Sequence, residues 1–284
     1  MTWGYALIWA GQFLKRDPDP LMAKLKFLEH YRLKTTGIGL GELDPMTPVQ
    51  RADLGRYLAD HDLRLHLIVG CGWLNPDRAA LRRATEAALA KLAEYAPIVR
   101  CPLVTTGGGP VHRFMREPSL ARQMDLLAEA LAPVAARCHD LGIPFGIENH
   151  GDYYCSDLAA LCRRVPHLGL FLDTGNTYLI GEAPLPAFEI AAPFTVGTHF
   201  KDHVVAPRPE VRPLHFEVGP SAIGDGDVPL REAYQLLLDH APDPSGLTME
   251  IELIMPSFAG NDPVEALERS LAFIRSLSPP PVRK

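Results

Sequence analysis

The sequence predicts an α/β protein built as a closed (β/α)8 TIM barrel, with residues 1–284 forming a single domain. Two observations lead to this prediction. Short β-rich runs alternate with segments of helical periodicity about eight times, which is the pattern of βαβ units around a parallel sheet. Several of these runs are also continuously apolar, as expected for parallel strands that are covered on both faces. A chain of 284 residues is long enough for one such barrel.

The eight expected strands are the apolar or β-branched runs of the chain. In order, they lie at residues 5–10, 36–43, 64–70, 96–104, 144–149, 168–173, 194–200 and 247–254. The expected helices lie between these runs and carry apolar residues at intervals of three and four. They span residues 20–31, 48–61, 76–96, 119–142, 156–165, 229–240 and 263–277.

One connection, at about residues 202–229, is much longer than an ordinary loop between a strand and its helix. Long loops in compact domains are usually functional or disordered. This one carries Arg208, Arg212 and His215, together with prolines that restrict its backbone. We expect it to fold over the barrel mouth and to help select the substrate. The alternative is that it packs against a second subunit of a homo-oligomer.

Composition and charge exclude several classes of function. A formal net charge of −6 is unfavourable for binding a phosphate backbone, so we expect no nucleic-acid partner. The apolar N-terminal stretch is too short to span a bilayer and lacks a basic flank, so neither a membrane segment nor a targeting signal is expected. The cysteines are odd in number and include no C-x-x-C pair, which indicates reduced thiols and a cytoplasmic protein.

Four consecutive strands of the second half end in or carry a residue that binds metal ions. These residues are Glu148, Asp173, His199 and Glu250. Because the carboxyl ends of barrel strands meet at one rim, the four side chains are expected to lie together. Three carboxylates would repel one another there unless a cation lay among them. We therefore predict one divalent ion, with Mn, Mg, Co, Fe and Zn all compatible with oxygen and imidazole donors.

Each of these residues also has an ordinary structural interpretation. Asp173 alone is typical of a helix cap, Glu148 of a salt-bridge partner, and His199 of a buried core histidine. Glu250 has a rival in Glu252, which lies two residues further along the same face of the strand.

The motifs GIENHG, LDTGN, THFKD, AIGDGDVP and TMEIE resemble those of the xylose isomerase-like TIM barrels. That superfamily includes sugar isomerases and epimerases, inosose dehydratases, and AP endonucleases of the endonuclease IV type. The resemblance implies that Glu148, Asp173, His199 and Glu250 are the metal ligands. It also implies that Glu148 and Glu250 are the catalytic residues that move protons.

The chain departs from the ketose epimerases at two places. Asn176 stands where those enzymes commonly have a histidine three residues after the aspartate, and Lys201, Asp202 and His203 stand where they have a substrate-binding arginine. The further histidines that endonuclease IV needs are missing before the glycine turn, which makes a DNA-repair function improbable.

Other polar or aromatic residues near the expected rim are candidates for binding substrate. They are Trp9, His66, Arg100, His150, Asn176, Lys201, Arg212 and His215.

The sequence as a whole predicts a metal-dependent isomerase or epimerase that acts on a small sugar-like or polyol-like molecule by proton transfer through an enediolate. The alternative is a metal-dependent lyase or dehydratase on a keto-sugar or inosose-like substrate. A third hypothesis, a non-catalytic sugar-binding barrel, is disfavoured because binding alone does not require paired acid and base groups.

Overall fold

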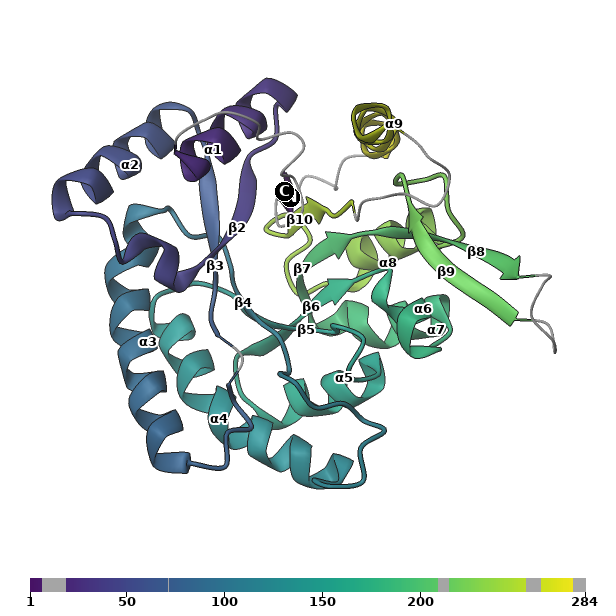
Figure 1. Cartoon of the computed structure of the whole chain (residues 1–284), viewed down its shortest axis with the longest axis horizontal. Coiled ribbons are helices and arrows are strands. Elements are labelled where there is room, and N and C mark those ends of the chain that lie inside the picture. The colour runs from purple at the N-terminus through teal and green to yellow at the C-terminus, as the bar shows by residue number, and fades with distance from the viewer. Residues whose placement is uncertain (7–18, 71, 209–214, 254–261, 278–284) are drawn as a thin grey trace.

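The barrel strands form where the chain carries runs of apolar and β-branched residues, and the computed structural model describes them within residues 1–6, 19–70, 72–208, 215–253 and 262–277. The run LGLFLD, for example, is buried at every position, as required of a parallel strand with both faces covered. Eight parallel strands close into a barrel in the order β1-β10-β7-β6-β5-β4-β3-β2, which confirms the predicted fold class (Figure 1). The barrel strands are β1 (Thr2–Tyr5), β2 (Thr35–Gly39), β3 (Arg64–Ile68), β4 (Val104–Thr106), β5 (Phe145–Glu148), β6 (Leu168–Asp173), β7 (Thr195–Phe200) and β10 (Thr248–Ile251).

Helices follow the strands and cover the outside of the barrel (Figure 1). Local signals set where they begin: the Asp19 carboxylate accepts hydrogen bonds from the first backbone N–H groups of the first helix, and Thr47 and Gln50 form a capping box on the second. The α-helices are α1 (Pro20–Tyr31), α2 (Pro48–Asp60), α3 (Arg78–Ile98), α4 (Leu120–Asp140), α5 (Cys155–Arg164), α6 (Asn176–Ile180), α7 (Pro184–Ala191), α8 (Leu230–His240) and α9 (Pro263–Ser276). Two 3₁₀ turns, η2 (Leu40–Leu43) and η3 (Ala192–Phe194), follow β2 and α7.

Three of the predicted strands differ from the structure. The run 36–43 is a strand only as far as Gly39, because residues 40–43 form the 3₁₀ turn η2. The first strand is β1 at residues 2–5, and most of the predicted run 5–10 lies outside the described residues. The run 96–104 is not a strand, because α3 continues to Ile98 through Pro97 and the chain then turns at Arg100 with a φ of 52°. The fourth barrel strand therefore starts later, at Val104.

The long connection after β7 is ordered over much of its length. It forms an antiparallel hairpin of β8 (Asp202–Arg208) and β9 (His215–Ser221), with Asp202 paired to Ser221 at the base. Figure 1 shows this hairpin projecting from the molecule beside α6 and α7. The Asp202 carboxylate accepts hydrogen bonds from the backbone N–H groups of Gly224, Gly226 and Val228, which ties the glycine-rich turn to the hairpin base.

Candidate metal centre

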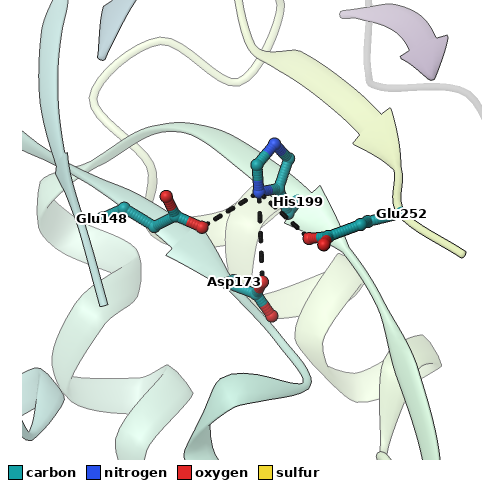
Figure 2. Close-up of side chains that lie close together, drawn as sticks. All are labelled: Glu148, Asp173, His199 and Glu252. Carbon is teal, nitrogen blue, oxygen red and sulfur yellow. Dashed lines mark hydrogen bonds and ion pairs between the residues drawn. The ribbon is translucent and has the colours of Figure 1, made fainter. Parts of the chain in front are cut away.

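The carboxyl ends of β5, β6, β7 and β10 are neighbours in the barrel and bring together four side chains of the types that can bind metal ions. These are Glu148, Asp173, His199 and Glu252, the last of which follows β10 directly (Figure 2). One donor atom from each residue lies within 4.8 Å of the others. We refer to these four residues as the rim cluster.

His199 lies at the centre of the rim cluster. Its Nδ1 atom is 3.0 Å from Glu148 Oε1, 3.2 Å from Glu252 Oε2 and 3.9 Å from Asp173 Oδ2. Burial lowers the pKa of the imidazole, but the Glu148, Glu252 and Asp173 carboxylates outweigh burial and raise this pKa to about 10. The site therefore attracts positive charge strongly.

Asp173 serves the fold and the rim cluster with different oxygens. Its Oδ1 accepts hydrogen bonds from the backbone N–H groups of Gly175 and Asn176 at 2.8 and 3.0 Å, at the start of α6. Its Oδ2 faces His199 and Lys201. Burial raises the pKa of this fully buried carboxyl. The helix-cap and metal-ligand interpretations of Asp173 are thus compatible with each other.

Lys201 supplies a fixed positive charge beside the rim cluster. Its ammonium lies 3.0 Å from Asp173 Oδ2, 3.1 Å from Glu252 Oε2 and 3.2 Å from Asn176 Oδ1. Burial lowers the pKa of this amine, and the two carboxylates more than compensate, so the pKa is raised and Lys201 stays charged.

The rim cluster fits a divalent cation in both charge and donor type. Three carboxylates carry three negative charges, and Lys201 offsets one of them. The remaining two charges match one divalent ion when the imidazole is neutral, and carboxylate oxygens with one imidazole nitrogen suit Mg²⁺, Mn²⁺, Zn²⁺ and related ions.

The rim cluster differs from the predicted ligand set at one position, because it contains Glu252 and not Glu250. The strand register explains the difference. Glu148 pairs with Phe171, two residues before Asp173, while His199 is the register partner of both Asp173 and Glu250. The strands are staggered around a barrel, so a residue of β10 at the height of the rim must lie further along its strand. Glu252 is at that position, and Glu250 lies one layer below it.

Glu250 is fully buried and bonds to a different set of residues. Its Oε1 atom lies 2.9 Å from Nδ1 of His66 and accepts a longer hydrogen bond, at 3.4 Å, from the Thr35 hydroxyl. His66, predicted to bind substrate, is itself buried inside the barrel against Glu250 and the Phe171 ring.

The other predicted substrate-binding residues are dispersed. Asn176 contacts Lys201 beside the rim cluster, and His150 is exposed on the loop after β5. Arg100 is placed away from the rim, because its guanidinium donates to the backbone carbonyls of Leu58 and Leu63, next to the amino end of β3. His215 pairs with Arg208 at the far end of the hairpin. Trp9 and Arg212 lie outside the described residues.

Two further contacts support the rim cluster. The Asn149 side chain accepts a hydrogen bond from the Asp173 backbone N–H at 2.7 Å and donates to the Asp173 carbonyl at 2.9 Å, which links the ends of β5 and β6. The Phe171 ring meets the His199 ring edge-on at 4.6 Å. The position of Asn149 directly after the strand-end glutamate was the only sequence signal for the first contact.

Within the described ranges, none of the helices has both the length and the apolar character needed to cross a membrane.

Comparisons with known proteins agree with this fold. The sequence model of the family described as "Xylose isomerase-like TIM barrel" matches residues 30–277. A curated relative, "Uncharacterized protein YihM" of Escherichia coli (strain K12), is 28% identical over 167 residues, which are 55% of this chain and 49% of that protein. The match thus spans about half the length of this relative.

Two solved structures illustrate the likeness of fold. D-psicose 3-epimerase with D-tagatose from Clostridium cellulolyticum H10 superposes with a TM-score of 0.70 at 15% identity and covers 97% of both chains. A xylose isomerase-like TIM barrel protein from Mycobacterium smegmatis in complex with magnesium has a TM-score of 0.66 at 17% identity, covering 92% of this chain and 89% of the other. At these identities the likeness concerns the fold.

Proposed function

The chain belongs to the xylose isomerase-like TIM barrel family, and on this basis we propose that it is a divalent-cation-dependent isomerase or epimerase acting on a sugar or a related polyhydroxy carbonyl compound. The observation that carries the proposal is the convergence of three carboxylates and one imidazole at the carboxyl ends of four adjacent strands. This is the face of a (β/α)8 barrel at which active sites are built.

In this proposal Glu148, Asp173, His199 and Glu252 hold the cation. A bound divalent ion supplies positive charge that polarises a substrate carbonyl and its neighbouring hydroxyl, which makes the adjacent C–H group more acidic. Asn149 and Phe171 keep Asp173 and His199 in place through the contacts described above.

Glu148 and Glu252 are the proposed acid–base pair. Figure 2 shows the two carboxylates approaching His199 from opposite sides. The Glu148 side chain is 15% exposed and that of Glu252 is 8% exposed, so Glu148 is the more accessible of the two. One carboxylate removes the proton next to the carbonyl, and the other returns a proton. Return to the opposite face of the same carbon gives epimerisation, whereas return to the neighbouring carbon gives isomerisation. Glu250, expected in this role from the sequence, has no exposed surface through which to meet a substrate.

Lys201 and Asn176 are proposed to bind substrate oxygens, since both lie beside the rim cluster and carry hydrogen-bond donors. Lys201 also favours a second candidate reaction, the loss of water from the same deprotonated carbon skeleton. A charged ammonium next to Glu252 can give its proton to a departing hydroxyl. A product lighter by one water distinguishes this lyase reaction from an isomerisation.

Deuterium exchange tests the proposal even when the product of the reaction has not been identified. The protein is incubated in D₂O with Mn²⁺ and a panel of ketoses, aldoses and keto-sugars, and carbon-bound deuterium is followed by NMR and mass spectrometry. We expect cation-dependent exchange next to the carbonyl of at least one sugar, and its loss in Glu148→Gln. The matched control is Glu129→Gln, which changes an exposed glutamate of helix α4 on the outside of the barrel and should exchange normally. Tight sugar binding with no exchange would indicate a binding barrel instead.

A further inference from the structure

A second polar group lies beneath the rim cluster and is not explained by the proposed reaction. Glu250 is fully buried, and its Oε1 atom is held by His66 and Thr35. Its Oε2 atom and the Nε2 atom of His66 are also buried, and neither has a hydrogen-bond partner within the described part of the chain. Burying such atoms without a partner is costly, so their retention calls for an explanation.

The free oxygen of Glu250 faces His199. Glu250 Oε2 lies 3.9 Å from Nε2 of His199, the ring nitrogen that Figure 2 shows pointing away from the three carboxylates. His199 therefore lies between two acidic groups, with the rim carboxylates at Nδ1 and Glu250 at Nε2.

Neighbouring residues pack closely against His199 and His66. The Phe171 ring packs edge-on against His199 and also contacts His66, with ring centroids 4.6 and 5.9 Å apart. Gly37 leaves room for the His66 ring, because a Cβ atom at this position would lie 2.5 Å from His66 Cε1 and Nε2. The pair of Glu250 and His66 thus occupies a fitted space inside the barrel.

We propose that Glu250 and His66 are positioning residues for His199. Glu250 holds the Nε2 side of the imidazole, so that Nδ1 stays directed at the rim cluster, and His66 holds the Glu250 carboxylate in place. Histidines that bind metals commonly donate their second ring N–H to a carboxylate, which fixes the ring and strengthens binding. The inference rests on the proposed function in one respect, namely that the rim cluster binds a divalent cation.

Calorimetric titration with Mn²⁺ tests this role in paired variants. Glu250→Met removes both oxygens at similar length, and we expect Mn²⁺ to bind about 10–100-fold more weakly. The Mn²⁺ affinity of Glu250→Gln should lie between those of Glu250→Met and the wild type. An amide offers one acceptor and one donor group, so it can satisfy only one of its two neighbours, His66 and His199. Thr36→Val is the matched control, since it removes a buried hydroxyl of β2 that has no partner within the described residues, and it should bind Mn²⁺ normally.

Variants of His66 test whether this residue holds the Glu250 carboxylate in place. They also replace the Glu250 variants if the latter do not fold. His66→Asn keeps an N–H donor near the position of Nδ1 and should retain most of the Mn²⁺ affinity. His66→Leu has no such donor, and its Mn²⁺ affinity should be lowered about as much as that of Glu250→Met. Equal affinities for these two His66 variants would overturn the role of His66.

Crystal structures without any cation separate this inference from the proposed function. In Glu250→Met we expect the His199 ring to turn away from its wild-type orientation, a result that does not depend on metal binding. An unmoved ring would overturn the positioning role, and so would an unchanged Mn²⁺ affinity. Loss of Mn²⁺ as complete as in Glu252→Gln would instead make Glu250 a ligand and would also overturn it. A wild-type protein that binds no Mn²⁺ refutes the proposed function, while the ring orientation still decides the positioning role.

Discussion

Replacing Lys201 with methionine removes the positive charge that contacts both Asp173 and Glu252 while keeping a side chain of similar length. The ammonium lies 3.0 and 3.1 Å from these carboxylates and is almost completely buried. At an effective dielectric constant of about 20, each contact corresponds to a Coulomb energy of roughly 5 kcal/mol, which is partly offset by the cost of burying the ammonium. Buried pairs that lose one partner typically cost about 3–5 kcal/mol, and we expect a loss of this size in the free energy of unfolding.

The loss should depend on divalent cations, because the variant leaves the rim cluster more negative. We expect Mn²⁺ at one fixed concentration to stabilise Lys201→Met more than it stabilises the wild type, following the linkage between binding and folding. Urea unfolding in EDTA and in Mn²⁺, monitored by circular dichroism, measures both quantities.

The matched control is Arg164→Met, which breaks the exposed pair of Arg164 with Asp125 at 2.7 Å. It should cost less than about 1 kcal/mol with or without Mn²⁺. A Lys201→Met loss as small as this control, or a loss that Mn²⁺ leaves unchanged, would refute the charge balance described for the rim cluster.

Three other variants test individual residues of the structure. Glu252→Gln should weaken Mn²⁺ binding by more than the roughly 10–100-fold typical of residues outside the ligand set; calorimetry measures this, and near-normal binding would remove Glu252 from the site. Arg100→Ala should lower the free energy of unfolding by about 1–2 kcal/mol through its lost hydrogen bonds to backbone carbonyls, with Mn²⁺ affinity unchanged; weakened binding would return Arg100 to the rim. Burial raises the pKa of Asp152 to about 6, so the folded protein holds this proton more tightly than the unfolded chain. The resulting stabilisation, up to about 3 kcal/mol, is present below about pH 4 and lost as the pH rises through 6; Asp152→Asn should remove this slope from the unfolding free energy in EDTA, and an identical pH profile would show that Asp152 titrates normally.

The barrel could be predicted from the sequence because its strands and helices leave local signals. The run LGLFLD is apolar up to its final aspartate, and the helix that begins at residue 48 is preceded by a threonine cap. The run 96–104 misled the prediction, since its β-branched residues favour a strand locally. In the structure, helix α3 continues to Ile98 and a left-handed turn at Arg100 delays the strand, a result that depends on tertiary packing.

Three of the four residues of the rim cluster could be predicted from the sequence. Glu148 and Asp173 end their strands and His199 lies one residue before the end of β7, where the position along the chain nearly determines the height in the barrel. The choice between Glu250 and Glu252 needs the stagger between β7 and β10, and spacing along the chain does not encode it. The contact of His66 with Glu250 could not be predicted either, because β3 and β10 are not neighbouring strands and their side chains meet only inside the barrel.

The location of a bound cation tests the central claim most directly. Crystals grown with Mn²⁺ are examined by anomalous scattering at the manganese edge. We expect one peak per chain within about 2.0–2.3 Å of donor atoms from Glu148, Asp173, His199 and Glu252. A peak bound by Glu250 in place of Glu252, or no peak at the rim cluster with Lys201 still bridging Asp173 and Glu252, would contradict this claim.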